Sequence, residues 1–174
     1  MKVIIINGHG GAGKDTFIKF FAEHAGPQFV ENFSTVDYIK EIATKLGWEG
    51  TKEDESRRYL SLLKEMATYW ADIPFKDTLK QIEVFHDECV EFGVDSRAFI
   101  FIHCREPKEI QRLVDALSPK YPVYTLLIRR RGLGYYGNPS DDNVDKYDYD
   151  FIIENNYNLE NLKSSMIRFY NKVR

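Results

Sequence analysis

The chain has 174 residues, of which 43% are hydrophobic and 29% are charged. This composition is typical of a folded globular protein, and the length favours a single domain, residues 1–174. The formal net charge of −3 argues against a nucleic-acid-coating protein, because such proteins usually present a broad basic face. The two cysteines, Cys89 and Cys104, are not closely spaced, which indicates buried thiols in a reducing compartment.

The first predicted element is a strand at residues 3–6, a run of β-branched side chains that ends at Asn7 and Gly8. A continuous apolar run of this length is typical of a strand buried on both faces, as in a parallel sheet. The run is too short for a signal sequence or a membrane span. We therefore expect a cytoplasmic protein with no membrane partner.

A glycine-rich segment, INGHGGAGKDTF at residues 6–17, follows this strand and opens a predicted helix. The spacing Gly8-x-x-x-x-Gly13-Lys14 is that of a phosphate-binding loop, the Walker A motif. Glycines let the backbone curl so that several N–H groups face phosphate oxygens, and the helix N-terminus adds partial positive charge. Lys14 supplies a mobile cation. The predicted nucleotide-binding residues of this segment are Gly8, Gly10, Gly11, Ala12, Gly13, Lys14, Asp15 and Thr16.

Asp15 stands where the common motif has serine or threonine. Two interpretations are open. On the first, the carboxylate stabilises the first helical turn through the helix dipole; on the second, it replaces the missing hydroxyl near Mg²⁺, directly or through water. On the second interpretation Thr16 faces the phosphates one position later, and Asp15 and Thr16 are the candidate metal-binding residues.

Strand and helix patterns then alternate along the chain, which predicts an α/β fold. The further strands are expected at residues 28–33, 98–102, 123–128 and 150–153. Helices are expected at residues 36–46, at 82–92, at 107–117 with proline in the first turn, and at 158–173 with Asn158 as the cap. Between residues 51 and 93 two helical patterns follow each other without a strand, which predicts a helical insertion that carries substrate contacts.

The sequence Gly-Lys-Asp-Thr at residues 13–16 resembles a branch of P-loop kinases related to nucleoside monophosphate kinases. This branch includes phage deoxynucleoside monophosphate kinases and the animal-type phosphomevalonate kinase. The resemblance implies a P-loop three-layer α/β sandwich around a five-stranded parallel sheet of order 2-3-1-4-5. It also implies an acceptor-binding helical insertion at about residues 51–93, a short lid at about residues 129–148, and ATP and Mg²⁺ as cofactors.

Five residues are candidates for binding the phosphorylated acceptor, some from the resemblance and two from the ability of arginine to bind phosphate. Lys40 lies in a segment that matches the family's second strand and helix, and Arg57 and Arg58 lie on the insertion. The alternative for Lys40 is a solvated helix lysine, and the alternative for the two arginines is an ion pair with the acidic residues before them. Arg105 fits an Asp-x-Arg pattern after the third strand. His103 departs from that pattern, and it is either structural or a hydrogen-bonding partner of the acceptor.

Arginines follow the fourth strand, where relatives have a lid. By this match Arg129 packs against adenine, and Arg130 and Arg131 close over the phosphates; the alternative is a solvated surface turn. The predicted catalytic residues are therefore Lys14, Arg105, Arg130 and Arg131.

Two further segments border the predicted nucleotide site. Asn155 and Asn156 follow the last strand, where the resemblance places the neighbours of adenine. One interpretation of the acidic side chains of Asp141, Asp142 and Asp145 is that they pair with the lid arginines. Most such runs are solvated, and we favour that interpretation.

The leading hypothesis is an ATP-dependent kinase that transfers the γ-phosphoryl group to a nucleoside or deoxynucleoside monophosphate. A first alternative changes the acceptor to phosphomevalonate or a similar small phosphorylated metabolite. A second alternative is a nucleotide-binding regulatory protein with little turnover, which His103 in place of aspartate favours. The identity of the acceptor, closure of the lid and the oligomeric state stay open.

Overall fold

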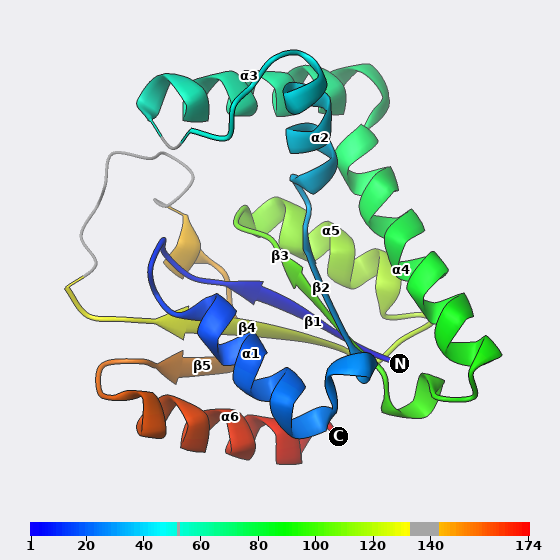
Figure 1. Cartoon of the computed structure of the whole chain (residues 1–174), viewed down its shortest axis with the longest axis vertical. Coiled ribbons are helices and arrows are strands. Elements are labelled where there is room, and N and C mark those ends of the chain that lie inside the picture. Colours follow the sequence, from blue (N-terminus) through cyan, green and yellow to red (C-terminus); the bar gives the residue numbers. More distant parts are fainter. Residues whose placement is uncertain (52, 133–142) are drawn as a thin grey trace.

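The centre of the molecule is a sheet of parallel strands, seen edge-on among helices in Figure 1. The computed structural model describes residues 1–51, 53–132 and 143–174. Within those ranges the sheet has five strands in the order β2-β3-β1-β4-β5, and each neighbouring pair is parallel. This arrangement confirms the predicted fold class and strand order. The strands are β1 Lys2–Asn7, β2 Val30–Ser34, β3 Phe99–His103, β4 Val123–Arg129 and β5 Phe151–Glu154.

Helices connect the strands. They are α1 Lys14–Ala25, α2 Asp37–Lys45, α3 Asp54–Ala71, α4 Ile73–Glu91, α5 Pro107–Leu117 and α6 Leu159–Val173, with 3-10 turns η1 Pro27–Phe29, η2 Asp95–Arg97 and η4 Val144–Lys146. Asn158 caps α6 as predicted, since its Oδ1 accepts a hydrogen bond from the Asn161 backbone N–H at 3.0 Å. In the ranges that the structure describes, no helix has the length and apolar character needed to cross a bilayer.

Two hydrophobic layers enclose the sheet, as the uninterrupted apolar run of β1 predicts. Ile4 and Ile6 face α1 and α6, while Val3 and Ile5 face the opposite layer, which α4 and α5 cover. All four side chains are fully buried, and each contributes roughly 1.5–3 kcal/mol of hydrophobic stabilisation relative to exposure. A strand buried on both faces is held firmly at the centre of the sheet, so the segment that leaves it starts from a fixed position.

The region expected as a helical insertion contains α3 and α4. Helix α4 packs on the sheet through Ile82, which is buried, whereas α3 lies beyond the sheet and contacts α2 and α4 (Figure 1). Asp72 joins the two helices in a left-handed conformation, with φ of 54°. Its carboxylate pairs with Arg112 of α5 at 2.5 Å, which ties the helix junction to the main body. Acceptor binding by this region stays a prediction.

Candidate nucleotide-binding site

The polar ends of the strands meet at one edge of the sheet. The strand register places Asn7 of β1 beside β4, His103 of β3 beside Ser34 of β2, and Arg129 of β4 beside Glu154 of β5. The glycine-rich loop leaves β1 at this edge and leads into α1 (Figure 1). Open α/β sheets bind their ligands at the carboxyl ends of the strands. The predicted loop therefore lies at the edge of the sheet where a ligand is expected.

Tight packing fixes the path of the loop backbone. Gly13 has φ of 98° and directly precedes α1, a left-handed conformation that side chains rarely adopt. A Cβ at Gly13 would lie 2.5 Å from Nδ2 of Asn155, and one at Gly8 would overlap the backbone oxygen of Ile128. Glycine is therefore required at both ends of the loop by the protein's own packing. At Gly10, by contrast, a Cβ would meet no protein atom within 4 Å.

Lys14 arches back across this loop from the first position of α1. Its Nζ donates hydrogen bonds to the backbone oxygens of Gly8 at 2.5 Å and His9 at 3.0 Å. The ammonium group and the N-terminus of α1 thus place positive charge at the same opening. The arrangement is suited to an anion with several charged oxygens.

A cavity of about 260 Å³ lies at this opening and gathers most of the predicted nucleotide-binding residues. Leu159 and Leu162, which the sequence analysis did not select, add an apolar wall from the start of α6. The cavity thus has a cationic end and an apolar end, as a nucleotide requires. The predicted residues among its lining are Gly11, Gly13, Lys14, Asp15, Thr16, Arg130 and Asn155.

Asn7 is a buried polar residue of the site that the sequence analysis missed. It is 1% exposed; its Oδ1 accepts from the Gly8 N–H at 2.8 Å, and its Nδ2 donates to the Arg105 backbone oxygen at 3.0 Å and to the Tyr149 hydroxyl at 2.7 Å. Tyr149 in turn donates to the backbone oxygen of Val144 at 2.8 Å, and burial raises its pKa to about 12. Asn7 therefore joins the loop to two segments distant in sequence. Its position at the end of a buried apolar strand was the available signal.

Asn155 braces the other end of the loop. Its Nδ2 donates to the Ala12 backbone oxygen at 2.9 Å, and its backbone N–H donates to the Arg129 backbone oxygen at 2.7 Å. The side chain also lines the cavity. Asn156 contacts other groups: its Oδ1 accepts from the Arg131 backbone N–H at 2.6 Å, and its Nδ2 donates to Glu154 at 3.0 Å. The contact of either asparagine with a base stays a prediction.

The arginines after β4 take different positions. Arg129 pairs with Asp145 at 2.8 Å and with Glu154 at 3.3 Å. The hydrogen bonds that its guanidinium donates, above all to Asp145, raise the pKa of Arg129. Arg130 and Arg131 are both exposed, and Arg130 lines the cavity. Residues 133–142 of the predicted lid lie outside the described residues, so the lid stays a prediction.

Asp145 corrects one interpretation. We favoured solvation for the acidic run, but Asp145 binds Arg129 and also lies 3.5 Å from His9 of the loop. Burial alone would raise the pKa of this carboxyl; the hydrogen bonds and charge of Arg129, with His9, outweigh it and lower the pKa. The sequence could not show this contact, because it joins the loop after β1 to a turn more than a hundred residues later. Asp141 and Asp142 lie outside the described residues.

His103 lies at the carboxyl end of β3, near the loop. Its Nε2 is 2.9 Å from Asn32 Oδ1 and 3.8 Å from a carboxylate oxygen of Asp15. Both neighbours are acceptors, so Nε2 carries the proton. Burial lowers the pKa of His103, opposed by the charge of Asp15. The imidazole is therefore neutral near pH 7 and connects the second strand to the loop region.

The candidate acceptor-binding cations are spread over three elements. Lys40 of α2 pairs with Asp37 at 2.6 Å, and Arg57 of α3 pairs with Asp54 at 3.7 Å; both partners lie one helical turn earlier. Arg58 is exposed on α3, and Arg105 is half-buried after β3. The pairing of Arg57 matches the alternative interpretation of this residue. Acceptor binding by these four residues stays a prediction.

The two cysteines agree with the expectation of buried thiols. Both are buried and outside any disulfide. Burial raises the pKa of Cys104 to about 12. It also raises the pKa of Cys89. Neither thiol is activated for nucleophilic chemistry, because the thiolate is the reactive form.

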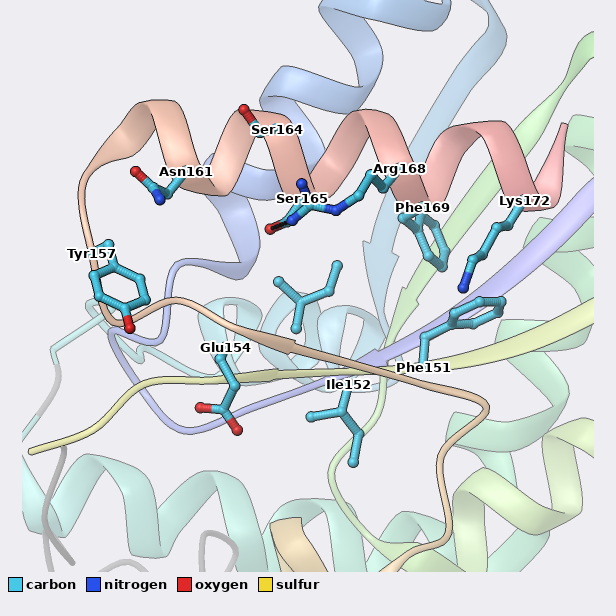
Figure 2. Close-up of a pocket in the computed structure, with 11 residues that line it drawn as sticks. Phe151, Ile152, Glu154, Tyr157, Asn161, Ser164, Ser165, Arg168, Phe169 and Lys172 are labelled. Carbon is cyan, nitrogen blue, oxygen red and sulfur yellow. Dashed lines mark hydrogen bonds between the residues drawn. The ribbon is translucent and has the colours of Figure 1, made fainter.

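A larger cavity, of about 410 Å³, lies away from the loop between β5 and α6. Figure 2 shows Arg168 and Lys172 of α6 on one side of it and Ile152 and Glu154 of β5 on the other. Arg168 donates to Ser165 at 2.8 Å, and Lys172 lies over the Phe151 ring at 5.6 Å. These cations already have partners within the cavity wall. The smaller cavity is the candidate functional site, because it joins the loop backbone to the α1 N-terminus.

The oxygen ligands at the loop suit a hard cation bound together with phosphate groups. Thr16 and Asp15 line the same cavity as Lys14, and the Asp15 side chain is 95% exposed. In the part of the chain that the structure describes, no cluster of three His, Cys, Asp or Glu could hold a metal by itself. Mg²⁺ commonly combines one or two protein oxygens with phosphate oxygens and water, and Asp15 and Thr16 fit that mode.

No protein-family model matches the chain, and no curated protein matches it. Several solved structures resemble it over nearly its whole length. An APS kinase from Mycobacterium tuberculosis is 10% identical with a TM-score of 0.46, covering 98% of this chain and 96% of that one. A thymidylate kinase from Ehrlichia chaffeensis is 12% identical with a TM-score of 0.47, covering 97% and 98%. A gluconokinase from Sinorhizobium meliloti is 12% identical with a TM-score of 0.47, covering 98% and 94%. These likenesses are distant, and the chemistry of the site rests on the chain's own geometry.

Proposed function

We propose that the chain is an ATP-dependent small-molecule kinase that transfers the γ-phosphoryl group to a nucleoside or deoxynucleoside monophosphate. One observation carries the proposal: the glycine loop, the Lys14 ammonium and the N-terminus of α1 converge on one cavity at the carboxyl edge of a parallel sheet. Backbone N–H groups, a lysine and a helix N-terminus in this order bind the phosphates of nucleotides in many proteins.

Positioning and charge neutralisation would supply most of the catalysis. Phosphoryl transfer requires little covalent chemistry from the protein, and a phosphate acceptor is already ionised near neutral pH. Lys14 and Arg130 line the cavity and would bind phosphate oxygens, while Leu159 would contact the apolar part of the nucleotide. Mg²⁺, held with ATP by Asp15 and Thr16, would neutralise phosphate charge. Asn7 and Asn155 would keep the loop from shifting during the reaction.

The acceptor would approach from the side of β2 and β3. Arg105 follows β3, and Lys40 lies on the helix after β2. Arginine binds phosphate through two parallel hydrogen bonds, which favours a phosphorylated acceptor over a neutral one. This supports the monophosphate, and a phosphomevalonate-type metabolite is the alternative acceptor of the same chemistry.

A coupled assay of ADP release tests the proposal, with Mg-ATP and a panel of nucleoside monophosphates, deoxynucleoside monophosphates and phosphomevalonate. We expect turnover with one class of acceptor and a loss of roughly 100-fold or more in Lys14→Ala, because the variant removes charge that stabilises the moving phosphoryl group. Lys19→Ala is the matched control, an exposed lysine farther along α1. ATP binding without turnover on any acceptor would overturn the kinase proposal.

His103 favours a second candidate, a nucleotide-binding regulatory protein with little turnover. The imidazole lies 3.8 Å from Asp15 and is hydrogen-bonded to Asn32. A neutral side chain therefore occupies the position at which the kinases that this sequence resembles commonly have an aspartate. We expect His103→Asp to speed phosphoryl transfer if a missing carboxylate limits metal binding, with His103→Asn as the uncharged control. Equal rates in the wild type and both variants would remove His103 as a reason for low turnover.

A further inference from the structure

An apolar stripe on α3 faces solvent. The residues on this side of the helix are Tyr59, which is half-buried, and Leu62, Met66, Tyr69 and Trp70; they follow one another at steps of three or four, except that Tyr69 and Trp70 are adjacent. Leu62 is 51% exposed and Met66 69%, while Tyr69 and Trp70 reach 91% and 82%. Monomeric proteins seldom expose a contiguous group of large apolar side chains of this kind, which usually marks an interaction surface.

This stripe is separate from the face that holds α3 on the molecule. Ser56 is buried, and Leu60, Leu63 and Ala67 are half-buried on the side that meets α2 and α4. The Ser56 hydroxyl accepts from Trp48 Nε1 at 2.5 Å. Packing within the chain therefore accounts for one side of the helix, and the aromatic side is left over. Figure 1 shows α3 beyond the sheet, and the exposed fractions of Leu62, Met66, Tyr69 and Trp70 leave the stripe open to another molecule.

We propose that this stripe is the interface of a homodimer, in which α3 of one chain crosses α3 of a second copy in antiparallel fashion about a two-fold axis at Met66. Leu62 and Trp70 are each four residues from Met66. A two-fold axis there places Leu62 of each copy against Trp70 of the other, so a small side chain meets a large one in both halves. Such self-complementarity is what a symmetric dimer requires.

The available area is sufficient for a specific dimer. Aromatic side chains bury roughly 150–250 Å² each, so Tyr69 and Trp70, almost fully exposed, would remove about 300–400 Å² from water in each copy. With Leu62 and Met66 added, the two copies together reach about 1,000 Å², the lower limit of a specific interface. Tryptophan and tyrosine are also the residues that most often dominate binding energy at interfaces.

Charge disfavours an anionic membrane as the partner. Helix α3 carries three basic residues, Arg57, Arg58 and Lys64, against three acidic ones, Asp54, Glu55 and Glu65. Helices that lie on membranes usually have a polar face rich in lysine and arginine. The balanced polar side of α3 leaves hydrophobic contact as the main attraction, which a second copy of the same stripe provides.

Sedimentation equilibrium of the full chain over a range of micromolar concentrations tests this proposal. We expect a mass of twice the 20.4 kDa monomer for the wild type and the monomer mass for the double variant Tyr69→Ser, Trp70→Ser. Phe92→Ser is the matched control, because Phe92 is 77% exposed just after the far end of α4. A monomeric wild type, or a double variant that remains dimeric, would overturn the proposal. Circular dichroism verifies that each variant is folded.

Cysteine cross-linking tests the position of the axis. Met66→Cys should form an intermolecular disulfide under mild oxidation, because the two copies of this residue meet at the axis. The control is Glu65→Cys, the neighbouring exposed residue on the polar side of α3. The native thiols are buried and do not interfere. Equal cross-linking of both variants, or none in Met66→Cys, would contradict the proposed crossing.

Discussion

The two sides of the candidate site differ in how firmly they are built. On the loop side, Asn7 and Asn155 make hydrogen bonds of 2.7–3.0 Å to the loop and to segments distant in sequence. On the acceptor side, Lys40 and Arg57 bind carboxylates of their own helices. The loop backbone is therefore held by contacts within the protein itself. If the proposal is right, Lys40 and Arg57 must exchange these local partners for the acceptor.

This contrast suggests that the two sides differ in how selectively each would recognise its ligand under the proposed function. A rigid loop recognises the triphosphate that many nucleotides share, and its rigidity lowers the entropy cost of binding. Long side chains on separate helices can fit acceptors of different shapes, and their exposed ion pairs are worth about 0.2–1 kcal/mol each. Under the proposed function, the choice of acceptor would therefore depend on the part of the site whose geometry the fold constrains least.

We expect the largest effect from a substitution in the glycine-rich loop. Gly13→Ala forces a side chain into a left-handed conformation and against Nδ2 of Asn155, 2.5 Å from the new Cβ. We expect it to destabilise the fold by roughly 1–3 kcal/mol and to weaken ATP binding at least tenfold, measured by thermal unfolding and calorimetry.

Gly10→Ala is the control for this substitution. Its Cβ meets no protein atom within 4 Å, so it should leave unfolding unchanged, while ATP binding weakens only if phosphate occupies that space. An equal loss of stability in both variants would show that the loop is less rigid than its packing indicates.

The loop side was also the part that could be predicted from the sequence. The β-branched strand, the glycine spacing and the helix that follows are local signals, and all three occur within residues 3–25. The contacts of Asn7 with Tyr149 and of His9 with Asp145 join segments more than 130 residues apart, and no periodicity reports them. Strand limits shifted by one or two residues where a turn intervened, as at Pro27, which begins a 3-10 turn before β2.

A second prediction tests the hydrogen bonds by which Asn7 supports the loop. Asn7→Ala removes the partner of the Gly8 N–H and of the Tyr149 hydroxyl in a site that is 1% exposed. An unsatisfied buried polar group costs about 1–3 kcal/mol, so we expect a loss of about 1–2 kcal/mol in the free energy of unfolding by urea. Asn156→Ala, in an exposed setting, should change it by less than about 0.5 kcal/mol. Similar values for the two variants would contradict a bracing role for Asn7.

A third prediction concerns Lys40 on the proposed acceptor side. Lys40→Ala should raise the acceptor KM roughly tenfold, equivalent to about 1.4 kcal/mol, with the KM for ATP unchanged, because only acceptor binding loses a cation. Lys45→Ala, at the exposed end of the same helix, is the control. Steady-state kinetics with each substrate varied in turn measure both constants. If the KM for ATP rises as much as that for the acceptor, Lys40 acts on the whole site.

The smallest expected effect lies between the two sides, at the contact of Asp145 with Arg129 and His9. The pKa of Asp145 is lowered in the folded chain, so its ionised form stabilises the fold above the unfolded pKa near 4, and this contribution is lost as pH falls through the folded value. The side chain is 51% exposed, which limits the effect to less than about 1 kcal/mol. Asp145→Asn should therefore be slightly less stable than the wild type at pH 7 and equal to it near pH 2. A difference that persists at the lower pH would assign the effect to packing and not to charge.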